Sequence, residues 1–354
     1  MATIFKDGWY SMGFDMSPSG ANVFTAGGSA GGGNVGSANS ANTPYSFGFS
    51  WALNNQFSII GLGTNLTTLY CGFWLKLAAY PGTSNEICAY YDVTAAARQC
   101  HLRVYSDGHV QFCTGNSTTT IGTASSAGVI PLNTWVHIQT KVTIDAAAGV
   151  VECKINNSSV IASSGLNTKS TANTWVSGLL LSSINTTSNT YYDDLWMLDN
   201  SGSSPFNTYL GIIQVKGEKP SANSGVGGRN AYTPSNPQND NHLNVGNVPA
   251  STSQFNSDNN TGDYDMFQFP SLSTASSVLA LNCWVTVGQD AGGSHTIGID
   301  CYSSGTDAIG SAITPAGAST PSFVNQTFSV DPHTSAAWGV SAAGSAELGI
   351  KTLS

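Results

Sequence analysis

Residues that could carry acid–base catalysis are few in this chain. There are four glutamates, and each is isolated in the sequence: Glu86, Glu152, Glu218 and Glu347. A glycosidase that retains configuration needs two carboxyl groups about 5 Å apart. Glu152 alternates onto the polar side of a strand-like run, which favours a solvated surface charge. We therefore predict no catalytic residues.

Histidine and cysteine supply no metal motif. The chain has six histidines but no H-E-x-x-H motif, and it lacks a G-x-x-x-x-G-K-[ST] phosphate loop. His137 alternates onto the same polar side as Lys141, so it is predicted to lie at the surface. The seven cysteines are odd in number, widely spaced and without a C-x-x-C pair. They are predicted to be reduced, structural residues of a protein made in a cytoplasm.

One acidic cluster could bind calcium. Asp258, Asn260, Asp263 and Asp265 place several oxygen atoms close together in the sequence, and Ca²⁺ takes roughly 6–8 oxygen ligands. However, the glycine of this run is not at the EF-hand position, and no glutamate closes the loop. A solvated turn rich in Asp and Asn is the favoured interpretation, with calcium as the alternative. No other cofactor is predicted.

Neighbouring residues of a strand point to opposite faces, which limits the remaining candidates. Asp193 and Asp194 are adjacent and are not expected to act together; one should tie a loop, with a calcium ligand as the alternative. In each of the pairs Tyr90–Tyr91 and Tyr191–Tyr192, one ring must face inward. Trp196 is a further candidate for stacking on a sugar. Five other tryptophans are expected in the cores: Trp74, Trp135, Trp175, Trp284 and Trp338. No glycan-binding residue is nominated.

The polar surface must be built from hydroxyl and amide groups. Only 9% of the residues are charged, against roughly 25% in an average soluble domain, whereas Ser, Thr and Asn make up 112 of the 354. A net charge of −9 with only 11 Lys and Arg argues against nucleic acid as a partner. No apolar run approaches the roughly 18 residues of a membrane span, and Met1–Tyr10 does not resemble a secretory signal.

Short alternating runs between turn residues predict an all-β fold. Residues 135–156 indicate an antiparallel hairpin that turns at 145–149, and residues 101–113 indicate a second one that turns at Asp107-Gly108. Good helix formers are scarce. Other strands are expected at Leu69–Leu77, Glu86–Asp92, Trp175–Ile184, Tyr191–Leu198, Tyr264–Phe269, Val278–Val287, His295–Cys301, Phe323–Val330, Ala336–Val340 and Leu348–Thr352.

Composition shifts along the chain predict four segments. Residues 1–44 form an N-terminal segment whose glycine-rich part, 26–44, is expected to be a long loop or an arm without regular structure. Residues 45–215 form the first β domain, and 216–254, rich in Pro, Asn and Gly, form a linker or strap. Residues 255–354 form a smaller C-terminal β-sandwich.

The first domain resembles the laminin-G-like, or concanavalin A-like, family. The residues that carry the resemblance are FWLK at 73–76, the Asp107-Gly108 turn, LNTWVHI at 132–138 and DDLW at 193–196. They occur in the family's order over residues 45–215. The resemblance implies a jelly-roll sandwich.

The C-terminal part resembles the final domain of tailed-bacteriophage virion proteins. Asp331-Pro332, Trp338 and the run Glu347–Lys351 carry this second resemblance, together with residues 201–215. The sequence Leu210–Val215 departs from the pattern because it lacks an aspartate. The resemblance implies a structural protein of a phage particle.

The expected function follows from these two resemblances. We expect a non-enzymatic virion component, either a capsid decoration, a head fibre or a tail appendage, that binds other virion proteins of the capsid or tail lattice. By analogy it should be a homo-oligomer, with a trimer favoured. It would be assembled in the host cytoplasm and lie on the virion surface. The alternative is a receptor-binding tail-fibre protein that recognises host glycan, and a polysaccharide-degrading enzyme ranks below it.

Overall fold

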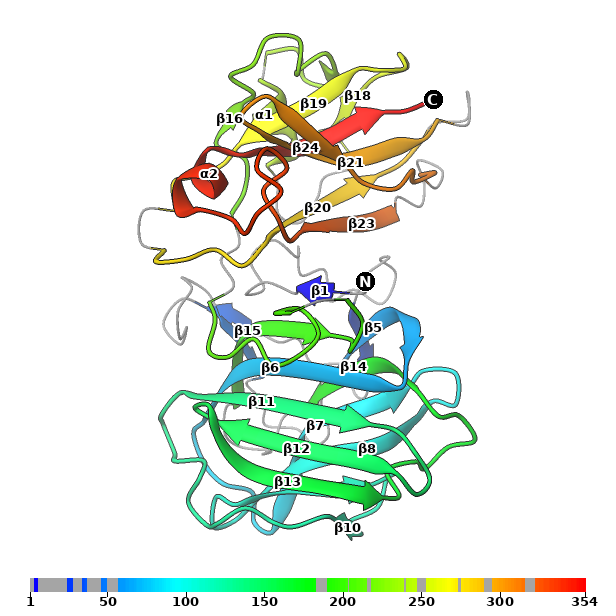
Figure 1. The fold of residues 1–354 in the computed structure, drawn as a ribbon, viewed down its shortest axis with the longest axis vertical. Helices are drawn as coiled ribbons and strands as arrows, with labels where there is room; N and C mark the ends of the chain where they lie inside the picture. The colour runs from blue at the N-terminus through cyan, green and yellow to red at the C-terminus, as the bar shows by residue number, and fades with distance from the viewer. Residues whose placement is uncertain are drawn as a thin grey trace. The chain divides into compact units, whose positions relative to one another are not determined.

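The protein is nearly all β, which confirms the predicted fold class (Figure 1). The chain divides into two compact units, residues 1–10 with 16–217 and residues 11–15 with 218–354. No helix in the described part of the chain is long and apolar enough to cross a membrane. The computed structural model describes residues 3–5, 24–27, 34–36, 46–49, 57–182, 190–202, 204–214, 218–238, 240–246, 253–272, 275–289, 295–315 and 322–354.

The first unit is a jelly-roll sandwich of two antiparallel sheets. Sheet A has the order β13 (Ser158–Leu166), β12 (Gly149–Ile155), β11 (Val136–Thr143), β6 (Thr68–Leu77), β15 (Thr190–Leu198), β4 (Ser46–Phe49) and β3 (Asn34–Gly36), with β1 (Thr3–Phe5) also on β15. Sheet B has the order β10 (Thr120–Ile121), β9 (Val110–Thr114), β8 (Ala97–Tyr105), β7 (Ser84–Asp92), β14 (Val176–Ser182), β5 (Phe57–Leu66) and β2 (Phe24–Gly27).

Both predicted hairpins are present, and local contacts explain their turns. Strands β11 and β12 pair from Ile138–Ile155 to Thr143–Val150. The Asp145 carboxylate accepts the backbone N–H groups of Ala147 and Ala148, both at 2.7 Å, which closes the turn. In the β8–β9 hairpin, Gly108 has a φ of +78°, a conformation that glycine adopts without strain.

The core of the first unit follows the period-two pattern of its strands. In β6 every second residue, from Leu69 through Phe73 to Leu77, is fully buried. The Tyr90 hydroxyl, from sheet B, bonds the Thr140 hydroxyl of sheet A inside this core. All seven cysteines are among the described residues, and each is free and buried. They act as small apolar side chains.

The glycine-rich segment 26–44 contains regular structure, so the prediction of a wholly irregular arm is wrong. Residues of β2 pair with β5, and β3 pairs with β4. Strand pairing uses backbone N–H and C=O groups, so small residues can take part in a ladder when neighbouring strands are in place. The other residues of this segment lie outside the described ones.

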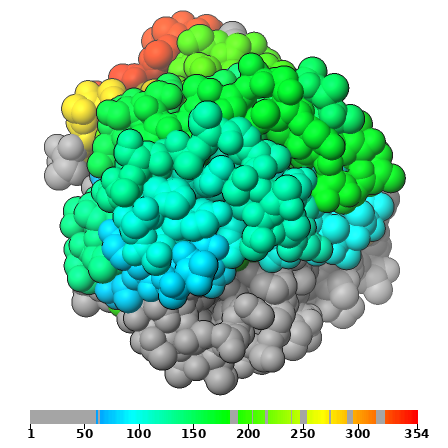
Figure 2. Space-filling view, turned by 90° about the horizontal axis from the view of Figure 1, so that it is seen from below, coloured from blue at the N-terminus to red at the C-terminus, as the bar shows by residue number. Residues whose placement is uncertain are grey.

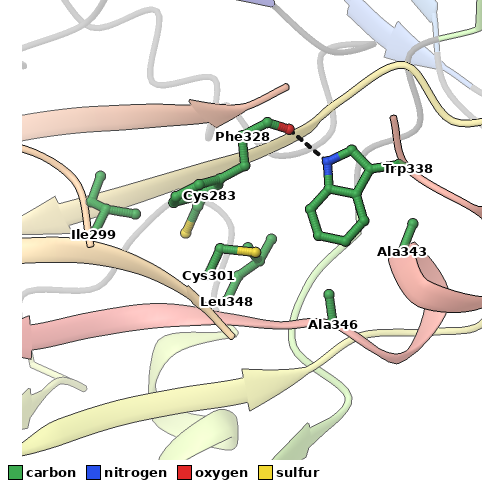
Figure 3. Close-up of a cluster of buried hydrophobic side chains, with 8 residues drawn as sticks. All are labelled: Cys283, Ile299, Cys301, Phe328, Trp338, Ala343, Ala346 and Leu348. Carbon is green, nitrogen blue, oxygen red and sulfur yellow. Dashed lines mark hydrogen bonds between the residues drawn. The ribbon is translucent and has the colours of Figure 1, made fainter. Parts of the chain in front are cut away.

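The second unit is a smaller β-sandwich. Its helices are α1 (Asn241–Val245) and α2 (Val340–Ser345). Figure 3 shows its core, in which the Trp338 indole donates to the Phe328 carbonyl at 2.8 Å beside Cys283 and Cys301. Its main sheet has the order β16 (Ala222–Asn223), β19 (Tyr264–Gln268), β24 (Glu347–Thr352), β21 (Ile297–Ser303) and β22 (Thr306–Ile309). Two further pairs are β17 (Thr233–Pro234) with β18 (Asn256–Ser257), and β20 (Leu281–Val287) with β23 (Ser322–Phe328).

Two predicted segments take a different form in this unit. The described part of 216–254 is packed on the second unit, because β16 pairs with β19 and Ser221 N–H donates to the Gln268 carbonyl at 2.9 Å. The strand expected at 336–340 is absent, since α2 begins at Val340. The turn before it is held by Asp331, whose carboxylate accepts the backbone N–H of His333 at 3.0 Å.

Candidate functional site

Side chains that could contact a ligand form rows across the outer face of sheet A. Alternate residues of each strand enter the core, so the others line up from strand to strand on the opposite side. Read across β15, β6, β11 and β12, the rows are Tyr191–Lys76–Trp135, Asp193–Trp74–His137, Trp196–Gly72–Gln139–Lys154 and Tyr70–Lys141–Glu152.

The first row forms what we call the aromatic platform: Trp135, Lys76 and Tyr191. All three side chains are partly exposed. The two rings lie 6.4 Å apart between centroids at an interplanar angle of 57°. The Lys76 ammonium lies 5.3 Å from the Trp135 centroid and 4.8 Å from that of Tyr191. Burial lowers the pKa of Lys76 from its ordinary value. Trp135 is therefore a surface residue, and its predicted place in the core is wrong.

In the second row Asp193 and His137 are buried and Trp74 is partly exposed, which corrects the prediction that His137 lies at the surface. His137 is fully buried, and neither of its ring nitrogens has a hydrogen-bond partner among the described residues. Its ring meets the Trp74 ring edge-on at 5.3 Å. Burial lowers the pKa of His137 to about 4, so the imidazole is neutral at pH 7. A neutral imidazole cut off from solvent has a packing role.

The third and fourth rows are covered by residues 204–214. We call this segment the strap from here on; it precedes the predicted linker at 216–254 and is distinct from it. Tyr209 of the strap packs edge-on against Tyr70 at 5.2 Å, and its hydroxyl donates to Glu152 at 3.0 Å. Strap residue Gly211 donates its N–H to the Gln139 side chain at 2.9 Å. Glu152 also pairs with Lys141 at 3.2 Å. Glu152 is therefore part of a contact network, although it was predicted to be a solvated charge.

A second polar cluster lies on the outer face of sheet B and was not foreseen from the sequence. Glu86 is 5% exposed, and Arg98 binds its two carboxylate oxygens at 2.6 and 3.0 Å. The Ser182 hydroxyl donates to the same carboxylate at 2.7 Å. His101 lies 4.0 Å away and is also buried, which lowers its pKa. The sequence feature that could have indicated this cluster is the short run Arg98–Arg103, which contains a histidine and two of the chain's three arginines.

A β-bulge changes the expected geometry of Asp193 and Asp194. The register of β15 on β6 shifts between Asp193 and Trp196, and Asp194 has a φ of +48°. Both aspartates are fully buried, and the Asp193 carboxylate accepts the backbone N–H of Asp194 at 3.0 Å. Simple alternation therefore does not apply here, because the bulge inserts an extra residue.

The structure keeps three of the predicted calcium ligands, Asp258, Asn260 and Asp263, in contact, and directs the Asp265 carboxylate to other partners. Asp265 is buried and accepts the amide groups of Asn241 and Asn256, both at 2.7 Å, while burial raises its pKa to about 6. Asn260 donates its amide N–H to Asp258 at 3.1 Å and to Asp263 at 3.2 Å. These hydrogen bonds use the amide N–H groups of Asn260 to hold the turn together. Among the described residues, no group of three or more His, Cys, Asp or Glu could hold a metal ion.

The comparisons with known proteins give distant structural likenesses. No protein family matches the sequence, and no curated protein matches it. An alginate lyase Aly36B bound to an alginate tetrasaccharide has 12% identity and a TM-score of 0.33, over 43% of this chain and 79% of that one. The cellulose-induced protein Cip1 has 12% identity and a TM-score of 0.39, over 58% and 99%. Trypanosoma rangeli sialidase has 12% identity and a TM-score of 0.31, over 43% and 25%.

These findings contradict the expected role as a non-enzymatic phage structural protein. The structures named above are not virion proteins, and two of them are enzymes. The short motifs behind that expectation have local structural roles in this chain. Asp331 holds a turn, Trp338 fills the second core, and the buried Glu347 accepts the Gly225 N–H at 2.9 Å. Such residues are required by the fold itself, and they identify no function.

Proposed function

We propose that the first unit binds carbohydrate at the aromatic platform. The observation that carries the proposal is the pair of partly exposed rings, Trp135 and Tyr191, held 6.4 Å apart on neighbouring parts of one sheet. Adjacent rings at a surface form a contiguous apolar patch, and such patches can mark ligand-binding sites. An aromatic face packs well against the C–H groups of a pyranose ring.

The surroundings of the platform add polar contacts for sugar hydroxyls. The loop before β11 exposes Asn133 and Thr134 directly next to Trp135. The Lys76 ammonium between the two rings supplies further N–H donors. An apolar surface with a few convergent donors is the usual composition of a small-ligand site.

The rows beside the platform keep it rigid. The Trp74 ring and the buried His137 form the next row of the same face, and the strap covers the rows beyond. Because these elements are already fixed, a sugar would meet rings whose positions need little ordering, which favours binding.

The test is glycan binding by the full chain and by Trp135→Ala. An array of neutral and acidic oligosaccharides identifies a ligand, and calorimetry then measures its affinity. Loss of one stacking ring should weaken binding by about 5- to 30-fold, about 1–2 kcal/mol. The matched control is Phe255→Ala, which removes a ring that is 47% exposed in the second unit. Unchanged affinity of Trp135→Ala, or a wild-type chain that binds no glycan, would refute the proposal.

A further inference from the structure

The outer side of the β8–β9 hairpin presents an arginine whose charge has no carboxylate partner. Arg103 donates from Nε to the Ser84 hydroxyl at 3.2 Å and from Nη2 to the Ser84 carbonyl at 2.9 Å. The remaining nitrogen, Nη1, lies 3.4 Å from His101 Nε2. Among the described residues, no Asp or Glu forms an ion pair with Arg103.

The neighbouring carboxylate is already engaged. Glu86 lies opposite Arg103 in the strand register, but Arg98 and Ser182 occupy both of its oxygens. His101 adds no negative charge: its Nδ1 faces the Gly115 carbonyl at 2.9 Å and must donate to it, which leaves Nε2 as an acceptor. Glu86 is thus paired with Arg98, and the Asp107 carboxylate at the hairpin turn is bonded to His109, so the Arg103 guanidinium is left without an ion pair among the described residues.

A primary amide stands beside the Arg103 guanidinium. Gln111 of β9 is directly opposite Arg103 of β8, partly exposed, and its side chain has no hydrogen bond to the described residues. Side chains opposite each other on one face of an antiparallel pair have Cβ atoms about 5 Å apart. The guanidinium Nη1 and the amide N–H can therefore both donate to one planar group with two oxygens.

The next row of the hairpin carries a pair of stacked rings. The rings of Tyr105 and His109 stack at 4.2 Å with an interplanar angle of 12°. The Asp107 carboxylate holds His109 at 2.5 Å, which fixes the stack at the turn. The chain near β9 reaches the solvent surface in the view of Figure 2, where it appears in teal.

We propose that Arg103 and Gln111 bind the carboxylate of an acidic saccharide such as a uronic acid. The flat fork of arginine suits a carboxylate, and the stacked rings beside it offer an edge for the sugar. The chain as a whole is unfavourable for anions, with 20 Asp and Glu against 11 Lys and Arg. Retention of an acidic sugar would therefore depend on this local pair. The site lies on sheet B and is separate from the aromatic platform on sheet A.

The test uses trigalacturonic acid and its methyl ester as matched probes. The chain contains three arginines, so its arginine Nε–H signals are few in a ¹H–¹⁵N spectrum, and Arg103→Gln identifies the one from Arg103. The acid should shift that signal and the ester should not. Calorimetry should give at least a tenfold weaker affinity for Arg103→Gln, a smaller loss for Gln111→Met, and no change for Lys219→Gln, which removes the same charge from the second unit.

Several outcomes would overturn this proposal. Equal binding of acid and ester, or equal affinity of Arg103→Gln and wild type, would show that the carboxylate is not recognised. Displacement of the trisaccharide by an equal concentration of inorganic sulfate would show that only charge is sensed. If Arg103→Gln does not fold, the loss expected for Gln111→Met decides. Trp135→Ala should leave this binding intact, so failure here is distinguishable from failure of the platform.

Discussion

Gly72 should be among the least replaceable residues of sheet A. It lies in the middle of β6, and the Trp196 ring from β15 rests directly on it. A Cβ atom at position 72 would stand 2.3, 2.4 and 2.5 Å from Cε2, Nε1 and Cζ2 of that ring. Carbon atoms in contact are normally about 3.5–4.0 Å apart. In Gly72→Ala the ring or the strand must therefore move by about 1 Å.

The ring has little room for such a movement. Trp196 is fully buried, and the strap residue Gly211 is bonded to Gln139 in the same row. Overpacking of a filled site costs about 1–3 kcal/mol. For a unit of this size each kcal/mol corresponds to about 2–4 °C in Tm. We therefore expect Gly72→Ala to lower the Tm of the first unit by about 3–10 °C.

The assay is thermal unfolding followed by calorimetry and near-UV circular dichroism. The matched control is Gly61→Ala, also at a strand glycine, where an added Cβ meets nothing within 4 Å. It should leave the Tm unchanged or raise it slightly, because alanine reduces the entropy of the unfolded chain. An unchanged Tm for Gly72→Ala would refute the reasoning.

A double-mutant cycle locates the clash. Trp196→Phe alone loses ring volume but no hydrogen bond to the described part of the chain, where the buried Trp196 Nε1 has no partner. The smaller ring leaves space for the new methyl group at position 72. The double variant should therefore be more stable than the sum of the two single effects predicts, by about 0.5–3 kcal/mol. Strict additivity would show that Trp196 does not limit the site.

Two further predictions concern pH and the strap. Burial, with repulsion from Asp307, raises the pKa of Asp300 to about 6, above the roughly 3.9 of an unfolded aspartate. The folded state then binds more protons between these values, so its stability falls as pH rises through them. Asp300→Asn should gain stability relative to wild type between pH 4 and pH 7 in urea unfolding; a constant difference contradicts this. Tyr209→Ala loses the Glu152 bond, the Tyr70 contact and the Lys154 ammonium 4.0 Å from its ring. Proteolysis within the strap should be about tenfold faster than in wild type and faster than in Tyr209→Phe, which loses only the hydrogen bond; equal rates for the two variants would count against the packing role.

Local sequence patterns were sufficient to predict many of the strands and turns of the first unit. The hairpin of β11 and β12 could be predicted because alternation and turn chemistry act between residues close in the chain. The contact between Asp145 and the N–H groups of Ala147 and Ala148 is of this kind. The same reasoning assigned the inward residues of β6, such as Phe73.

Alternation assigns a side of the strand, but it cannot tell whether that side meets solvent. His137 was expected at the surface and is buried, whereas Trp135 and Lys76 in the neighbouring row of the same face are partly exposed. Tyr209 reaches Glu152 across 57 positions of sequence, and no local pattern contains that contact. The bulge at Asp193 likewise depends on how β15 pairs with β6.

The sequence by itself determined an all-β chain, its principal turns and the apolar side of most strands. Only the tertiary structure decided which polar sides remain open, namely the aromatic platform and the Arg103–Gln111 pair. It also placed Glu86 against Ser182, 96 positions away. The reason is physical: turn and strand preferences are set by neighbouring residues, whereas solvent exposure and charge pairing depend on groups that only the folded chain brings together.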